Sequence, residues 1–140
     1  MAGLGAEMAS TGRLNPAGVE RGFAALSRFA ALAKGMGIEP LTCVATAAVR
    51  EAEDGPDFQA RIERETGIRM WVIDGEEEAR LSAQGVLLGW PGAFGLVCDI
   101  GGSSMELAEM NSPKSSSKTT IDSFSSSLVT NPATLGSSIY

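Results

Sequence analysis

The sequence predicts a mixed α/β fold in which helices cover the faces of a sheet. Segments with the three- and four-residue apolar spacing of amphipathic helices alternate with short apolar runs typical of buried strands. Strands separated by helices need crossover connections, which place helices on the faces of a mixed or parallel sheet. We therefore expect a helix, a strand, two helices, a strand, a helix and two final strands.

The first predicted helix begins at Asn15 and Pro16. Asparagine caps free backbone amides, and proline suits the first helical turn. Gly35 and Gly37 end the helix, as glycine commonly does. Its apolar residues form one stripe, which consists of Val19, Phe23, Leu26, Ala30 and Ala33.

Two strands and two shorter helices follow. Residues 41–46 predict a buried strand, and residues 47–52 predict a short helix. The next helix opens at Pro56 and stops at Gly67, and residues 68–73 predict the second strand.

The last predicted helix spans residues 74–89. It is followed by a strand over residues 94–100 and a possible partner strand over residues 105–110, joined by the turn GGSS.

The composition changes sharply after Met110. Residues 1–110 carry a net charge of -7, whereas residues 111–140 contain ten serines and carry +1, which together give the net charge of -6. Such a Ser-rich stretch cannot bury enough apolar surface to offset the entropy of ordering its backbone. We therefore expect one domain over residues 1–110 and a disordered tail over residues 111–140.

Several chemistries and partners are excluded by composition. The chain has no histidine, so serine-histidine-aspartate hydrolysis, histidine-ligated zinc and a phosphohistidine intermediate lack their central group. Cys43 and Cys98 lie in apolar runs and are expected to be reduced and buried. The acidic balance argues against a nucleic-acid polymer, and no run approaches the roughly 18 apolar residues of a membrane helix. We expect a cytoplasmic protein with no membrane partner.

The helix over residues 74–89 carries the first candidate site. Asp74 and Glu77 form a capping-box pattern, which explains them without any function. Glu78 instead falls near the middle of the helix's apolar face, and a buried carboxylate needs a cation or a donor. It is therefore the acid best placed for chemistry. The alternatives are a partly exposed helix glutamate, or one paired with an arginine such as Arg80.

The turn between the last two strands carries the second candidate site. A strand that ends in Asp99 and turns through glycines and serines exposes successive backbone amides, which can bind phosphate oxygens. Asp99 can hold Mg²⁺ or orient water, and Glu106 adds a further acid. The alternative is a plain β-hairpin with a glycine-rich turn. The candidate phosphate-binding residues are Gly101, Gly102, Ser103 and Ser104.

Arg50 is the third candidate. It lies just past the strand over residues 41–46, at the carboxyl edge where open α/β sheets place ligands. A guanidinium there could clamp a phosphate with two hydrogen bonds. The alternative is an exposed helix arginine near Glu51 or Glu53.

Three motifs together carry a resemblance to a known family. In their order and spacing, VATAAVREAEDGPDF, VIDGEEEARLSAQGV and LVCDIGGSSMEL resemble the exopolyphosphatase and guanosine pentaphosphate phosphohydrolase family. The preceding segment, LGAEMASTGRLNPAGVERGFAALSRFA, is similar to that family's early helical region. The resemblance covers residues 4 to about 109. It implies an incomplete actin-like (ribonuclease H-type, ASKHA) α/β fold and Mg²⁺-assisted hydrolysis of a terminal phosphoanhydride.

The resemblance also implies roles for individual residues. Glu78 matches the catalytic glutamate that activates water, and Arg50 matches an arginine of the phosphate channel. Ser103 stands where the family usually has a third glycine, and Met105 where it has a threonine. The second phosphate loop, with its aspartate and glutamate near the metal, is matched by Asp99, Gly101, Ser104 and Glu106.

The implied partners are polyphosphate or guanosine pentaphosphate, with Mg²⁺ as the cofactor, and full-length relatives are expected to be homodimers. The sequence does not choose between these substrates. Because the chain lacks the family's first phosphate loop and its second domain, we expect a fragment whose Ser-rich tail is unrelated to the family. Two alternatives stay open: a non-catalytic phosphate-binding fragment, and a relative of the actin-like ATPases and sugar kinases that share the DIGG-type turn.

Overall fold

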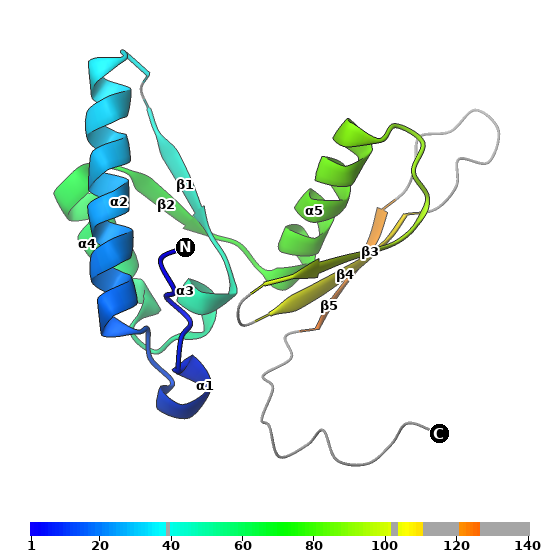
Figure 1. The fold of residues 1–140 in the computed structure, drawn as a ribbon, viewed down its shortest axis with the longest axis horizontal. Coiled ribbons are helices and arrows are strands. Elements are labelled where there is room, and N and C mark those ends of the chain that lie inside the picture. The colour runs from blue at the N-terminus through cyan, green and yellow to red at the C-terminus, as the bar shows by residue number, and fades with distance from the viewer. Residues whose placement is uncertain (39, 102–103, 111–120, 127–140) are drawn as a thin grey trace.

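A computed structural model describes residues 1–38, 40–101, 104–110 and 121–126, which form two lobes (Figure 1). The first lobe contains α1 (Met8–Thr11), α2 (Pro16–Gly35), β1 (Thr42–Ala45), α3 (Ala47–Glu51), α4 (Gly55–Thr66) and β2 (Arg69–Val72). The second lobe contains α5 (Gly75–Gly89), β3 (Gly95–Ile100), β4 (Met105–Met110) and β5 (Ile121–Ser126).

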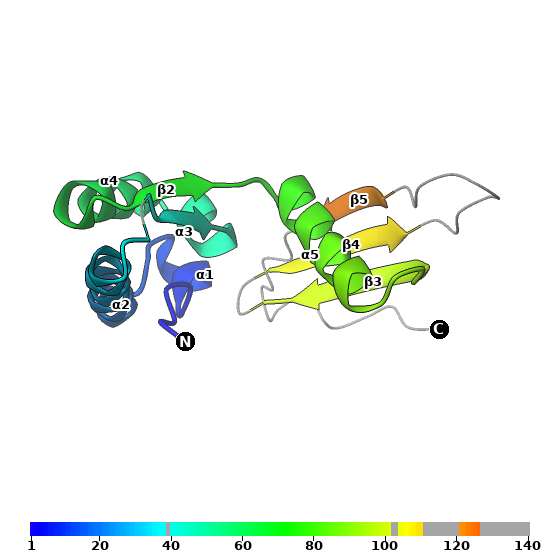
Figure 2. The ribbon, with the colours of Figure 1, turned by 90° about the horizontal axis from the view of Figure 1, so that it is seen from above.

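The first lobe is built on a parallel pair of strands. β1 and β2 pair with Thr42 opposite Arg69, and α3 and α4 make the crossover between them. Figure 2 shows α2 and α4 side by side at the end of the molecule away from the second lobe. Their apolar faces bury a core that includes Phe58, Ile62 and Met70.

The start of α2 agrees with its sequence signals. The Asn15 side chain accepts a hydrogen bond from the Gly18 amide at 2.9 Å, and Pro16 occupies the first turn. The predicted stripe packs against the core of the first lobe through Val19 and Phe23. The helix is thereby oriented by burial of one face rather than by propensity alone.

The second lobe is an antiparallel sheet covered on one face by a helix. The strand order is β3-β4-β5. Ala79 and Ala83 of α5 are buried against Ala108 and Met110 of β4. These small residues let the helix lie close to the sheet, which fixes the position of its first turn over the β3–β4 hairpin.

The mixed α/β class is confirmed, and the strands divide between two small sheets. Each predicted helix and strand is present, with ends that match or shift by one residue, while α1 and β5 are additional elements. β5 lies within residues 111–140, where composition predicts disorder. It forms there by pairing along the free edge of β4, with Ile121 opposite Met110. The rest of that segment lies outside the described residues.

The expectation for the cysteines is wrong at one position. Cys43 is half-buried, but Cys98 is exposed. β3 is an edge strand, and Cys98 alternates with Asp99 so that it lies on the sheet face opposite the one that α5 covers. An apolar run therefore does not ensure burial here.

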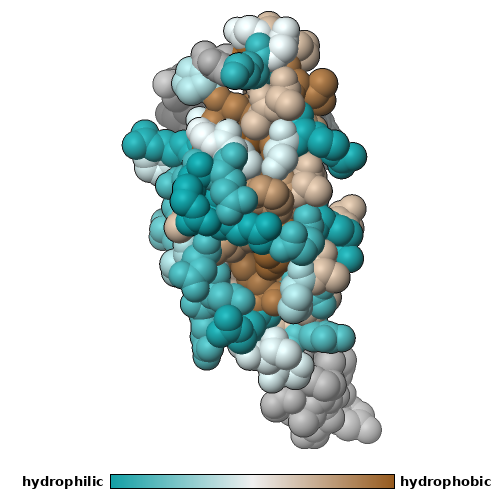
Figure 3. Space-filling model, turned by 90° about the vertical axis from the view of Figure 1, so that its left-hand side faces the viewer, coloured by the Kyte–Doolittle hydropathy of each residue, from teal (hydrophilic) through white to brown (hydrophobic). Residues whose placement is uncertain are grey.

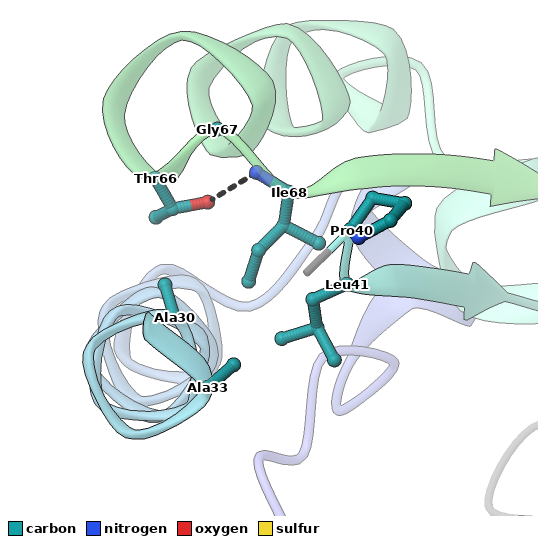
Figure 4. Close-up of a pocket in the computed structure, with 7 residues that line it drawn as sticks. All are labelled: Ala30, Ala33, Pro40, Leu41, Thr66, Gly67 and Ile68. Atoms are coloured by element: carbon teal, nitrogen blue, oxygen red, sulfur yellow. Dashed lines mark hydrogen bonds between the residues drawn. The ribbon is translucent and has the colours of Figure 1, made fainter. Parts of the chain in front are cut away.

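Within the described ranges, no helix is both long and apolar enough to cross a membrane. Figure 3 shows apolar side chains gathered along the middle of the face formed by the first lobe, with hydrophilic ones on either side. A hollow of about 430 Å³ opens in this lobe between α2, the segment before β1 and the end of α4 (Figure 4). Among the described residues that line it, none is ionisable, and the Thr66 hydroxyl accepts a hydrogen bond from the Ile68 amide at 3.2 Å.

Candidate active site

Arg50 is held at the edge of the first lobe that faces α5. β1 ends at Ala45, Thr46 precedes α3, and the buried Val49 anchors that helix in the core. The Arg50 side chain is 21% exposed. Its Nη1 donates a hydrogen bond to the carbonyl oxygen of Ile73 at 2.8 Å. The guanidinium thus reaches the segment that leads into the second lobe.

Glu78 lies in the first turn of α5, and its partner is Arg50. The Asp74 side chain caps this helix by accepting from the Glu77 amide at 2.8 Å. Oε2 of Glu78 accepts from Nη1 of Arg50 at 3.1 Å, and the Glu78 side chain is only 14% exposed. Arg80 pairs with Glu77 instead. The expected pairing of Glu78 with an arginine is therefore present, but the partner is Arg50 of the other lobe rather than Arg80.

Arg50 has a second, weaker ionic contact. Its Nη2 lies 3.5 Å from Oε1 of Glu51. The guanidinium therefore sits between two carboxylates. Because surface ion pairs contribute little, the shorter and more buried contact with Glu78 is the stronger of the two.

The β3–β4 hairpin carries the remaining candidates. Its turn is closed by a hydrogen bond from the Gly101 amide to the Ser104 carbonyl oxygen at 2.9 Å. The predicted phosphate-binding residues Gly102 and Ser103 lie outside the described residues. Asp99 and Glu106 stand directly opposite each other in the strand register, so both side chains point to the face that α5 covers.

Glu106 is the buried acid of the site, at 3% relative exposure. Burial raises its pKa, and the negative charges of Glu78 and Asp99 raise it further. A hydrogen bond from Ser104 and the positive charge of Arg50 act in the opposite direction on the same pKa. The charges of Arg50, Glu78 and Asp99 thus all act on the buried Glu106 carboxyl.

Ser82 is a site residue that the sequence reasoning missed. Its hydroxyl donates a hydrogen bond to Oδ2 of Asp99. The available signal was its position four residues after Glu78, which places both on one face of α5. The partner on β3 could not be identified from spacing alone.

The donor set at the hairpin suits a hard divalent cation. Mg²⁺ prefers oxygen ligands and is often held by one or two carboxylates, with waters and substrate phosphates completing its shell. Asp99 and Glu106 supply such a pair. The described part of the chain holds no cluster of three or more potential ligands. If Mg²⁺ bound to these two carboxylates, the rest of its coordination shell would come from water or other oxygen ligands.

The fold and this set of side chains define an α/β protein in which charged groups from two lobes lie close together. Comparison with known sequences shows its family: the chain matches the Ppx/GppA phosphatase family over residues 2–128 and belongs to that family. The predicted resemblance is thereby confirmed. The match extends beyond residue 110, and the predicted domain boundary there stays a prediction.

Curated relatives include exopolyphosphatase 1 of Mycobacterium tuberculosis and of Mycobacterium leprae. Each is 35% identical over 101 residues, which cover 71% of this chain. The same match covers only 29% of the Mycobacterium tuberculosis protein and 30% of the Mycobacterium leprae protein. The chain therefore spans less than a third of the length of these relatives.

Solved structures give the fold. An exopolyphosphatase-like protein matches with a TM-score of 0.77 and 33% identity, over 89% of this chain and 40% of that one. An exopolyphosphatase from Cytophaga hutchinsonii matches with a TM-score of 0.74 and 28% identity, over 89% and 39%. A Ppx/GppA family member from Aquifex aeolicus gives 0.67 and 28%, over 89% and 40%. The actin-like fold is therefore confirmed, and the chain contains part of it.

Proposed function

We propose that this chain carries part of the active site for hydrolysis of the terminal phosphoanhydride bond of polyphosphate, with guanosine pentaphosphate as the alternative substrate. The observation that carries the proposal is the ion pair between Arg50 of α3 and Glu78 of α5. The charges of this pair also act on the buried Glu106 of β4. The names of the mycobacterial relatives favour polyphosphate.

Glu78 is the proposed general base. It accepts a proton from a water molecule whose oxygen attacks the terminal phosphorus, while the bridging P–O bond breaks. The bond's electron pair leaves with the shortened chain, and orthophosphate is the second product. Phosphoryl transfer depends mainly on positioning and charge neutralisation, so this chemistry requires no histidine.

The other candidates bind and orient the phosphates. Arg50 offers several N–H donors to phosphate oxygens. The Gly101 amide already donates to the Ser104 carbonyl oxygen, so donors elsewhere in the glycine-serine turn remain a prediction of the sequence. Asp99 and Glu106 would hold Mg²⁺, which neutralises developing charge on the phosphate oxygens when it is bound. These roles follow from the resemblance, and the pairing of Asp99 with Glu106 across the hairpin supports those of the two carboxylates.

A second candidate function is phosphate binding without turnover. It is favoured by the ion pair that holds Oε2 of Glu78, the proposed base, against Arg50.

The test is phosphate release from long-chain polyphosphate and from guanosine pentaphosphate with Mg²⁺. Glu78→Gln keeps the size and a hydrogen-bond acceptor but removes the base, so release should fall at least 100-fold. Glu76→Gln is the matched control, because Glu76 is exposed on the same turn of α5. It should release phosphate at the unchanged rate.

Equal release by the Glu78→Gln variant and the unaltered chain would overturn the role of Glu78. Absence of release, combined with calorimetric binding of tripolyphosphate, would support the second function. Absence of both release and binding would overturn both functions for this chain.

A further inference from the structure

We propose that Ser82 is a positioning residue that orients Asp99 toward a bound Mg²⁺. The inference rests on the proposed function, in which Asp99 is a metal ligand. It adds a residue of α5 to the proposed metal site. The observation that supports it is the hydrogen bond from the Ser82 hydroxyl to Oδ2 of Asp99.

Asp99 needs such a partner because its residue is exposed near the end of an edge strand. An exposed carboxylate is free to change rotamer, and binding a cation then costs the entropy of ordering it. Among the described residues, the Ser82 hydroxyl is the donor that contacts the Asp99 carboxylate. It therefore selects one rotamer before the cation arrives.

The position of Ser82 is itself fixed by packing. Its neighbour Ala83 is fully buried, and Ala79 one turn earlier is nearly so. Both belong to the cluster that holds α5 on the β3–β4 sheet. The hydroxyl thus projects from a helix that cannot slide without opening this core, and it can act as a fixed point for Asp99.

The geometry leaves the other carboxylate oxygen for the metal. A carboxylate has two oxygens, and the hydroxyl bonds to Oδ2. Oδ1 is then available on the same sheet face as Glu106, the residue opposite Asp99. Partners that orient ligands in this way commonly change metal affinity by about 10- to 100-fold when they are removed.

The same helix also connects the metal ligand with the proposed base. Ser82 follows Glu78 by four residues, so both project from one face of α5. A helix that carries both groups sets the spacing between the water-activating carboxylate and the cation. Ser82 therefore links two parts of the site that lie on different strands and helices.

The experiment is a calorimetric titration of the whole chain with Mg²⁺, with Mn²⁺ electron paramagnetic resonance as a second readout. Ser82→Ala should weaken binding of both ions by about tenfold or more, and Ser82→Thr, which keeps the hydroxyl, should restore it to within about threefold. Ser27→Ala is the matched control, because Ser27 is a half-buried helix serine in the first lobe. Asp99→Asn should abolish binding.

The outcomes separate the inference from the proposed function. If the unaltered chain binds Mg²⁺, Asp99→Asn does not, and Ser82→Ala binds as tightly as the unaltered chain, the role of Ser82 is overturned while the metal site stands. Failure of Ser82→Thr to restore affinity would also overturn it. If the unaltered chain binds neither ion, both the inference and the proposed metal site fail.

Discussion

Replacing Gly55 by alanine should destabilise the first lobe and displace the helix that carries Arg50. A Cβ at position 55 would lie 1.9 Å from the Val49 carbonyl oxygen and 3.0 Å from its carbonyl carbon. These are backbone atoms, so no side-chain rotation relieves the clash. α3 and α4 must separate, and Val49 immediately precedes Arg50 in the chain.

The magnitude follows from two opposing effects. Overpacking of this kind costs about 1–3 kcal/mol, and the upper end applies where backbone must move. A glycine-to-alanine change also restricts the unfolded chain, which stabilises the folded state by about 0.4–1 kcal/mol. We therefore expect Gly55→Ala to lower the free energy of unfolding by about 2 kcal/mol. For a domain of this size that corresponds to a fall in Tm of about 8–16 °C.

Thermal unfolding followed by circular dichroism measures this change. Gly85→Ala is the matched control, because Gly85 lies inside α5 and nothing lies within 4 Å of a Cβ built there. It should raise stability by about 1 kcal/mol through helix propensity. A Gly55→Ala variant that melts at the same temperature as the unaltered chain would refute the close α3–α4 approach from which this prediction is worked.

Three further predictions concern the site and the cysteines. Glu78→Gln should bind tripolyphosphate about fivefold more tightly, because Arg50 loses a competing anion worth about 1 kcal/mol; unchanged affinity in calorimetry would contradict the ion pair. Burial raises the pKa of Glu106 above its ordinary value of 4.5, so ionisation of this carboxyl lowers the free energy of unfolding at neutral pH. This destabilisation decreases as the pH falls through the folded-state pKa and is absent below 4.5. Glu106→Gln should therefore have a higher urea midpoint than the unaltered chain at pH 7 and about the same midpoint near pH 4. An equal difference in midpoint at both pH values would contradict the raised pKa of Glu106. Cys98 should react with iodoacetamide before Cys43, whose thiol pKa is raised by burial, and peptide mass spectrometry showing the reverse order would refute the exposure of β3.

Local sequence signals predicted most of the fold because they act within a few residues. The Asn15 and Asp74 caps form the predicted hydrogen bonds, and the apolar stripe of α2 lies against the core. The division of the strands into two sheets depends on long-range pairing, which periodicity does not encode. β5 was missed for the same reason, since its residues pair with the edge of β4 despite a composition that predicts disorder.

For the candidate site, the residues themselves could be predicted from the sequence, whereas their partners in space could not. Residue types and motif order indicated Glu78, Arg50, Asp99 and Glu106, because carboxylates, a guanidinium and a glycine-serine turn are the groups that phosphate chemistry needs. The partners of these residues were not predictable. The pairing of Glu78 with Arg50 rather than Arg80 depends on how the two lobes meet, and the bond from Ser82 depends on how α5 lies on the sheet.

The pairing of Arg50 with Glu78 has a consequence for how a phosphate would bind. Nη1 of Arg50 already donates to the Ile73 carbonyl and to Glu78, and Nη2 faces Glu51. A phosphate dianion that approaches the guanidinium therefore meets two neighbouring carboxylates, and Glu78 competes for the same charge. If the guanidinium turned from Glu78 toward the phosphate, Oε2 of Glu78 would lose its contact with Arg50 and become available to a water molecule. Under the proposed function, the resting ion pair would therefore engage one oxygen of the base until an anion takes its partner.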